Sequence, residues 1–202
     1  MTPSVTQVFT GFEVAGYSIF LGAIPFGLLL TRAAGLGDIR AIGSGNIGAT
    51  NVLRTGRKGL AAATLLLDAA KAAAAVLLAQ YTVGSSWLPW AAFCAVLGHC
   101  YSPALNFKGG KGLASFLGAL IAMDWRVGAV ACAAWLVGAF SVRISSVGAL
   151  VSCAAAPVAA YVLLPRNWWV AVAATSVLVL WRHEANIRRL LAGQEPRFGG
   201  KG

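Results

Sequence analysis

Three polar segments carry most of the residues whose types and spacing could do chemistry. Residues 43–51 read GSGNIGATN, residues 98–112 read GHCYSPALNFKGGKG, and residues 182–198 read RHEANIRRLLAGQEPRF. Glycine backbone lets N–H groups approach an anion closely, and Lys or Arg side chains supply positive charge. We therefore expect these segments to bind phosphate groups.

The letters GSGNIG also fit G-x-G-x-x-G, the dinucleotide-binding fingerprint. That fingerprint needs a preceding strand, a following helix and an acidic residue about 20 positions later, inside a βαβ unit. Here an apolar stretch of membrane length comes first, and the next acidic residue is Asp68, in the middle of another apolar stretch. The context excludes a dinucleotide site, and no Walker A pattern is present.

The first segment combines backbone and side-chain hydrogen-bonding groups. If 47–54 forms a short helix, Ser44 or Asn46 would cap it, and the helix N-terminus would attract negative charge. Arg54 follows about two turns later. The candidate binding residues of this segment are Ser44, Gly45, Asn46, Gly48, Thr50, Asn51 and Arg54.

The second segment ends in a compact cationic turn, FKGGKG. Its two lysines act as point charges for phosphate, and its flexible glycine backbone can add N–H donors. Its candidates are Lys108, Gly109, Gly110, Lys111 and Gly112, together with His99 at the end of the preceding apolar stretch.

The third segment begins as an amphipathic helix. His183, Asn186 and Arg189 are three residues apart and fall roughly on one face. Arg143 and Ser145 form a smaller fourth polar group. The alternative for the third segment is an interfacial helix whose basic residues contact lipid headgroups. His, Asn and the basic residues would suit a bound anion equally well.

Composition indicates that membrane helices position these segments. The chain has 202 residues, of which 58% are hydrophobic and 11% charged, whereas a soluble domain has roughly 25% charged residues. A span takes about 20 apolar residues. We predict one all-α domain over 1–202 with seven spans, at 11–31, 59–81, 86–107, 112–123, 126–142, 144–164 and 167–182. The run 112–142 is too long for one span, and Asp124-Trp125-Arg126 divides it.

Charge predicts the orientation of the chain. Seven spans put most of the 16 Lys and Arg residues, and all four polar groups, on one face. The basic face is cytoplasmic by the positive-inside rule. We therefore expect the N-terminus outside and the C-terminus inside. The net charge of +10 suits an anionic lipid surface, and we do not expect a nucleic-acid partner.

We expect the remaining ionisable residues and the cysteines to have structural roles and to take no direct part in a reaction. Asp68 and Lys71 are three apart within the second span and should pair, because isolated charges in the membrane are costly. We expect them to support the span or the floor of the site. The four cysteines have neither metal-ligand spacing nor a disulfide framework, so we expect packed thiols and no metal.

Together the three segments resemble the motifs of a known family, the bacterial acyl-phosphate:glycerol-3-phosphate acyltransferases (the PlsY family). The matching patterns are SGNIGATN-x-x-R at 44–54, GH-x7-FKGGKG at 98–112, and RH-x-x-NI-x-R-L-x-x-G-x-E at 182–195. Three motifs in order over nearly the whole chain make the resemblance specific.

The resemblance implies a seven-helix membrane bundle in the bacterial inner membrane, with its active site on the cytoplasmic face. The implied reaction, the first acylation of phospholipid biosynthesis, moves a fatty acyl group from acyl phosphate in the bilayer to the 1-hydroxyl of cytoplasmic glycerol 3-phosphate. It yields lysophosphatidic acid and phosphate, and no cofactor is implied. By motif position, the implied catalytic residues are Ser44, Asn46, Lys111, His183 and Asn186. An H-x4-D pattern is absent because position 104 is Ala, so the family's use of the substrate phosphate as base is expected here.

Two other kinds of protein fit parts of this pattern. A membrane transporter of a phosphorylated metabolite would also cluster cations, but transporters often show inverted repeats and midplane broken helices, and no repeat is visible. A structural protein that gathers anionic lipids would not need the details of SGN and GGKG.

Overall fold

The computed structural model describes residues 4–198, and this part of the chain is helical with no strand. The α-helices are α1 (Val5–Ala23), α2 (Phe26–Ala33), α3 (Ala49–Leu53), α4 (Lys58–Thr82), α5 (Leu88–Cys100), α6 (Leu113–Met123), α7 (Trp125–Val142), α8 (Ser145–Leu163), α9 (Arg166–Arg182) and α10 (Glu184–Leu191). Short 3₁₀ turns η1 (Ile39–Ala41), η2 (Ser85–Trp87) and η3 (Pro103–Leu105) lie in the connections.

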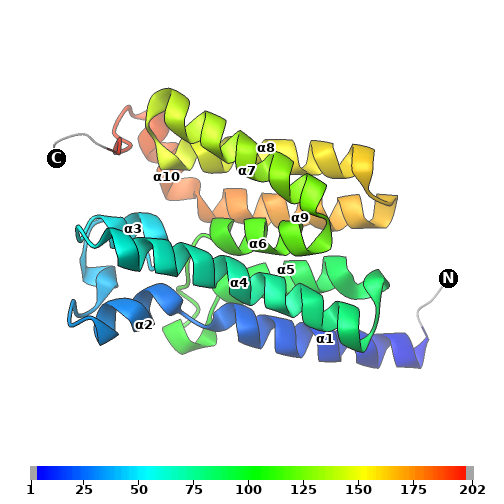
Figure 1. Ribbon diagram of the computed structural model, residues 1–202. Coiled ribbons are helices and arrows are strands. Elements are labelled where there is room, and N and C mark those ends of the chain that lie inside the picture. Colours follow the sequence, from blue (N-terminus) through cyan, green and yellow to red (C-terminus); the bar gives the residue numbers. More distant parts are fainter. Residues whose placement is uncertain (1–3, 199–202) are drawn as a thin grey trace.

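The long helices lie side by side and run alternately in opposite directions (Figure 1). The first described residues lie at one end of the bundle and the last ones at the other. We call the end that holds α3, α10 and residues 101–112 the polar end. All three polar segments of the sequence therefore meet at one end of the bundle.

The central helix of the bundle is α6, which packs against α4, α5, α7 and α9. Its Phe116 and Leu120 are each 1% exposed and join the largest buried cluster with Val96, Val127 and Val179. Together these residues form a core that fixes the start of α6, and so the end of the second polar segment, in the middle of the polar end.

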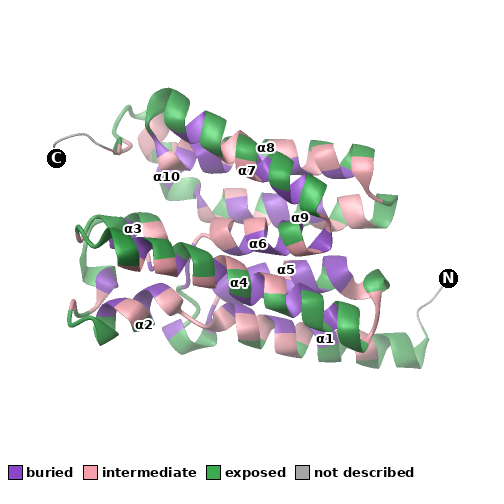
Figure 2. Cartoon of the chain, viewed as in Figure 1, coloured by how far each residue is buried: buried purple, intermediate pink, exposed green. Residues whose placement is uncertain are grey.

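The outer surface of the bundle is apolar. Exposed and part-exposed residues cover the outward sides of the helices, whereas the buried ones face inward (Figure 2). Large apolar side chains such as Leu66, Val137 and Trp181 are more than two-thirds exposed. Within residues 4–198, four helical stretches are long and apolar enough to cross a membrane, namely Val5–Ala33, Lys58–Thr82, Trp125–Val142 and Ser145–Leu163. This inside-out pattern is that of a membrane protein.

The predicted span 11–31 is not one continuous helix. Helix α1 begins earlier, at Val5, and ends at Ala23, and α2 begins at Phe26. Pro25 causes the break, because it has no N–H and disfavours the helical conformation at Ile24. Ile24 has φ −62° and ψ 117°, which is extended backbone.

The predicted span 86–107 is also wrong after residue 100, because α5 ends at Cys100. Pro103 disfavours helical backbone at Ser102, and Asn106 and Phe107 adopt left-handed conformations with φ of 51° and 61°. The chain therefore turns away and returns towards the bundle before α6.

The division of 112–142 into two helices is confirmed. Helix α6 ends at Met123 and α7 begins at Trp125, so Asp124 alone separates them. The Asp124 side chain accepts a hydrogen bond from the Arg126 N–H and pairs with its guanidinium at 2.7 Å. The other predicted helices, 59–81, 144–164 and 167–182, agree with α4, α8 and α9 to within one residue at each end.

Candidate active site

The first polar segment is a loop organised around one side chain. Asn51 is 2% exposed. Its Nδ2 group lies within 3.0 Å of the carbonyl oxygens of Ile39, Ile42 and Asn46, and its Oδ1 accepts from the N–H of Ser44 at 2.9 Å. These contacts use the hydrogen-bonding capacity of Asn51 inside the protein, so the structure places this residue under the loop and not in contact with a ligand.

The predicted cap of the short helix is wrong. Helix α3 begins at Ala49 behind Gly48, and no side chain caps it. Asn46 Oδ1 instead accepts from the N–H of Gly48 at 2.8 Å, and the Ser44 side chain lies 3.3 Å from Asn51 Oδ1. Glycine at 48 leaves the loop tight enough for the Asn46 side chain to fold onto its own backbone, as in an Asx turn.

Arg54 reaches back over the start of this loop. A Cβ atom on Gly43 would lie 2.8 Å from Arg54 Cδ, and Gly43 has a left-handed φ of +56°. Glycine therefore allows both the turn and the passage of the guanidinium. The result places Arg54 beside Ser44 at the surface of the polar end.

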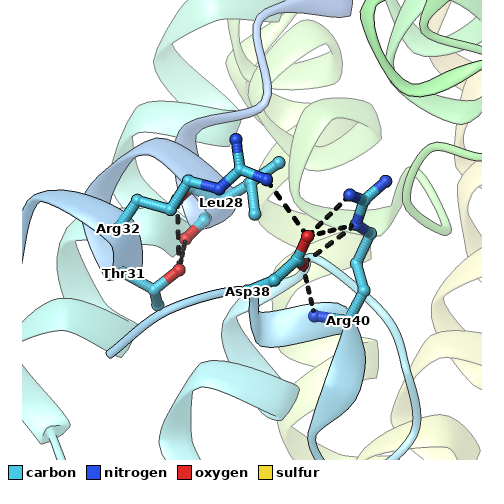
Figure 3. A network of polar contacts seen from close by, with 6 residues as sticks. Leu28, Thr31, Arg32, Asp38 and Arg40 are labelled. Atoms are coloured by element: carbon cyan, nitrogen blue, oxygen red, sulfur yellow. Dashed lines mark hydrogen bonds and ion pairs between the residues drawn. The ribbon is translucent and has the colours of Figure 1, made fainter. Parts of the chain in front are cut away.

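The approach to the loop is held by a separate ion cluster (Figure 3). Asp38 pairs with Arg32 at 3.1 Å and with Arg40 at 2.6 Å. Hydrogen bonds from Arg40 hold the pKa of Asp38 well below its usual range. The cluster joins the end of α2 to η1, and exposed pairs of this kind add little stability, so we assign it to the geometry of the connection.

The second segment returns to α5 through two glycines. The N–H groups of Gly109 and Gly110 donate to the carbonyls of Cys100 and His99 at 3.2 and 3.0 Å. Their own carbonyls accept from the Arg182 guanidinium, each at 3.1 Å. These two glycines therefore give their N–H groups to α5, contrary to the expectation that they would donate to phosphate.

The available N–H groups lie a few residues later. Gly112, with φ +88°, precedes α6, and no residue in 4–198 accepts from the N–H groups of residues 112–115. Such groups at a helix N-terminus point towards a bound anion. Lys111 lies directly before them, so the cationic side chain and the start of α6 form one anion-binding element.

Lys111 is half-buried among charged residues from the other segments. Burial lowers its pKa to about 8; Glu195 opposes this shift, while Arg189, Arg54 and Arg182 add to it. Three of the four neighbours are cations, so the local field is strongly positive. Lys111 makes no hydrogen bond or ion pair within the described chain, which leaves its ammonium group available to a ligand.

The third segment folds around the Glu195 carboxylate. Oε1 accepts from Ser146 Oγ at 2.8 Å and from Asn186 Nδ2, and Oε2 accepts from Arg189 Nε at 2.7 Å. Burial raises the pKa of Glu195, but these hydrogen bonds outweigh it and the pKa lies below its ordinary value. The residues after α10 are thereby tied to the start of α8.

Asn186 and His183 each keep one acceptor atom. Asn186 Oδ1 is buried and has no hydrogen-bond partner in residues 4–198. His183 Nδ1 lies 2.7 Å from the carbonyl oxygen of Val179, which can only accept, so Nδ1 carries the hydrogen. Burial lowers the pKa of His183 to about 4. The ring is therefore neutral at pH 7, and Nε2 bears a lone pair that can accept from a hydroxyl.

Several predicted site residues lie towards the edge of this arrangement. Thr50 and Ser145 meet at 3.3 Å and link α3 to α8. Lys108, Arg143 and Gly45 are exposed. His99 is 4% exposed and faces Asp68, so it lies beneath the glycines rather than among the cations. No cluster of potential metal ligands occurs among the described residues.

Three residues of the site were not among the predicted ones. Arg182 orients the glycine turn, and its guanidinium also lies over the Tyr101 ring, 5.0 Å from the centroid. Glu195 and Ser146 connect the third segment to α8. Arg182 and Glu195 are the first and last residues of the third motif. The motif itself was therefore the signal that could have marked them as site residues.

Comparisons with known proteins identify the family of this chain. Residues 12–193 match the family described as glycerol-3-phosphate acyltransferase. A glycerol-3-phosphate acyltransferase of Paramagnetospirillum magneticum is 54% identical over 93% of this chain and 92% of its own length. One from Ruegeria pomeroyi is 52% identical over 99% of this chain and 97% of its own.

Solved structures give the same result at the level of the fold. A crystal structure of PlsY, an integral membrane glycerol 3-phosphate acyltransferase, in its glycerol 3-phosphate form is 32% identical, with a TM-score of 0.88 over 94% of this chain and 96% of that one. The lysophosphatidic acid form gives 0.86 at 31% identity, over 94% and 95%. This chain therefore belongs to the glycerol-3-phosphate acyltransferase family, and it is an integral membrane protein built from helices.

Proposed function

We propose that this protein transfers a fatty acyl group from an acyl phosphate to the 1-hydroxyl of glycerol 3-phosphate. The products are lysophosphatidic acid and inorganic phosphate. One observation carries the proposal: half-buried Lys111 directly precedes the start of α6 and feels the positive charges of Arg54, Arg182 and Arg189, with Glu195 as the opposing carboxylate. Such an excess of positive charge suits two substrates that both carry phosphate.

The free donors and acceptors suggest a division of roles. Lys111 and the N–H groups at the start of α6 bind one phosphate. Ser44 and Arg54 bind the other, and neutral His183, whose Nε2 can only accept, orients the glycerol through a hydroxyl. Asn46 and Asn186 place the glycerol hydroxyls, and the unpartnered Asn186 Oδ1 supports this role because a buried acceptor calls for a donor.

The reaction itself needs little from the protein beyond positioning and charge. The 1-hydroxyl oxygen attacks the acyl carbonyl carbon, the bond from that carbon to the phosphate oxygen breaks, and the hydroxyl proton passes to the departing phosphate. Acyl phosphate is an activated anhydride with a good leaving group. Neutral His183 can accept a hydrogen bond from the neighbouring 2-hydroxyl and so hold the 1-hydroxyl in line.

We further propose seven membrane spans in a single domain, with the N-terminus outside and the polar end in the cytoplasm of a bacterial cell, at the inner membrane. The alternating helices (Figure 1) and the basic residues at the polar end support this orientation. Acyl phosphate would then arrive from the bilayer and glycerol 3-phosphate from the cytoplasm. A reporter enzyme active only in the cytoplasm, fused to the C-terminus, tests the orientation; an inactive fusion in a chain that inserts contradicts it.

The function is tested with pure protein in lipid, glycerol 3-phosphate and palmitoyl phosphate. Phosphate and lysophosphatidic acid should form in equal amounts, and palmitoyl-CoA should not replace the donor. Lys111→Ala should lower the rate by a large factor while the protein still inserts. Folded protein that makes no product from either donor, but moves phosphorylated solute into sealed vesicles, would be a transporter instead.

A further inference from the structure

A charged cluster lies buried beneath the glycine turn of the active site. Asp68 and Lys71 on α4 pair at 2.7 Å, and both side chains are 2% exposed. His99 on α5 is 4% exposed, and its Nδ1 lies 3.6 Å from Asp68 Oδ1. We call these three residues the buried triad. None of them belongs to the cationic surface that faces the substrates.

One side of the buried triad holds the break between α1 and α2. Lys71 Nζ donates to the carbonyl oxygen of Ile24 at 2.6 Å. The neighbouring carbonyl, that of Ala23, accepts from Ser102 Oγ at 2.7 Å. The interruption at Pro25 frees these carbonyls from the helical ladder. Side chains from α4 and from the residues after α5 then donate to them, and the Ile24 carbonyl also accepts from the Phe26 N–H at 3.1 Å.

The other side of the buried triad touches the glycine turn. A Cβ atom on Gly110 would lie 2.0 Å from His99 Nε2, so the imidazole ring packs directly against this backbone. The carbonyl of His99 also accepts from the N–H of Gly110 at 3.0 Å. His99 therefore fixes the turn through both its ring and its backbone, one residue before Lys111.

Helix α6 is tied to the same point. Ser115 Oγ donates to the backbone carbonyl of Asp68 at 2.9 Å. Two contacts thus flank Gly112 and the first turn of α6: Gly110 packs on His99, which faces Asp68 of α4, and Ser115 bonds to the backbone of Asp68. The buried triad therefore sets the position of the turn. The turn in turn sets the positions of the Lys111 ammonium group and of the free N–H groups.

Stability alone does not explain a buried triad of this kind. Buried ion pairs usually stabilise a protein no better than apolar residues of the same volume, because desolvation offsets their attraction. Ionisable groups within a membrane are costlier still. A unique geometry is what such a group can provide: Asp68 holds Lys71 by an ion pair at 2.7 Å, while His99 Nδ1 lies 3.6 Å from Asp68 Oδ1, beyond hydrogen-bond distance, and the ring is placed by its packing against Gly110.

We propose that Asp68, Lys71 and His99 are positioning residues that set the place of the Gly109–Gly112 turn, and with it the phosphate-binding element at Lys111. They act through the backbone of the turn and do not touch substrate. This inference rests on the proposed function, because its readout is the binding of the two phosphate substrates.

The test compares Asp68→Asn with wild-type protein in lipid, and measures KM for each substrate, kcat, and amide hydrogen exchange of residues 101–115. A displacement of about 1 Å can cost about a hundredfold in rate, so we expect KM for one or both substrates to rise about tenfold or more. Exchange of the turn should become faster. Ser152→Ala is the matched control, because Ser152 Oγ donates to the Ala131 carbonyl at 2.9 Å in the buried α7–α8 contact, and its KM values should stay as in wild type.

Two further variants separate positioning from simple stability. Asp68→Asn with Lys71→Gln removes both charges, so the fold should recover while KM stays high. Gly110→Ala should be impaired because its Cβ meets the His99 ring, and adding His99→Ala should restore part of the loss by making room.

Normal KM values and normal exchange in folded Asp68→Asn, or in the doubly neutral variant if Asp68→Asn does not fold, would overturn the proposal. Additive effects of Gly110→Ala and His99→Ala would overturn the contact on which it depends. An inactive wild type would instead refute the proposed function, so the two failures are distinguishable.

Discussion

The titration of Lys111 gives the sharpest prediction for the active site. Burial lowers its pKa to about 8, well inside the range in which the protein can be assayed. If the ammonium group binds a substrate phosphate, kcat/KM should fall as pH rises through this value. The perturbation is therefore pH itself, compared between wild type and Lys111→Arg.

The magnitude follows from the fraction of charged lysine. At pH 9, one unit above a pKa of about 8, about one molecule in eleven of the free enzyme keeps the charge. Because kcat/KM reports groups of the free enzyme, it should drop about tenfold between pH 7 and pH 9. Phosphate monoesters have their second pKa near 6, so glycerol 3-phosphate stays a dianion throughout this range.

The Arg variant provides the control. A guanidinium stays charged above pH 12, so Lys111→Arg should have a lower but nearly level kcat/KM from pH 7 to 9.5. Loss of folding cannot imitate the result. A lysine whose pKa is lowered on folding binds fewer protons in the native state between about 8 and 10.5, so its contribution to the free energy of unfolding rises with pH there.

The assay measures phosphate release at low concentrations of both substrates, at constant ionic strength, with a blank for spontaneous hydrolysis of the acyl phosphate. If kcat/KM of the wild type did not change with pH, then either the charge of Lys111 does not bind substrate or burial does not lower the pKa of Lys111. The same decline in Lys111→Arg would assign the titration to another group. Either result refutes the reasoning.

Three other substitutions test single contacts. Gly110→Ala should lower activity strongly, because its Cβ would lie 2.0 Å from His99 Nε2, whereas Gly59→Ala, with nothing within 4 Å, should leave turnover normal; equal turnover in the two variants would contradict the close contact. Arg182→Lys should lower activity at least about tenfold, since Lys cannot reproduce a planar fork that bonds two carbonyls and stacks on a ring; kinetics of purified protein would detect this, and full activity would remove the guanidinium from the argument. Cys153→Ala should leave turnover near normal, as Cys153 lies in the core; a large loss in well-folded protein would mean that this thiol takes part in the site.

Local sequence predicted the helices whose ends carry their own signals. Asp124 marks the junction of α6 and α7, because its side chain can accept from the next turn and a single extended residue is enough to reverse the chain. The apolar run of α4 starts at Lys58 and continues without Gly or Pro beyond its first turn. In such cases the boundary depends on neighbours in the sequence.

The missed boundaries lie at prolines within or near apolar runs, and distant contacts stabilise them. The break at Pro25 lies inside an apolar run, and Lys71 and Ser102 stabilise it from elsewhere in the chain. The end of α5 is set by a turn that returns to the carbonyls of His99 and Cys100. Apolar residues continue past both points, so composition alone could not locate them.

The motifs identified the segments of the site but not the partner of each group. The glycines of the second motif suggested phosphate donors, yet two of them bond to α5 and the free N–H groups begin at Gly112. Asn51 has the same hydrogen-bonding groups as Asn186, but only Asn186 keeps an unpartnered acceptor. Which amide faces a ligand is decided by burial and tertiary contacts, which a sequence pattern does not contain.

The arrangement of charge explains why Lys111 has no ion-pair partner before substrate binds. Glu195 is the carboxylate among the cations, but Ser146, Asn186 and Arg189 already occupy it. Lys111 therefore keeps its charge at a cost from burial, and a phosphate dianion removes that cost when it binds. Charge that attracts phosphate in the ground state does not by itself speed the reaction. The rate must then come from geometry: an acceptor of His183 or Asn186 takes the hydrogen of the 2-hydroxyl and so holds the 1-hydroxyl in line, while the leaving phosphate takes the 1-hydroxyl proton.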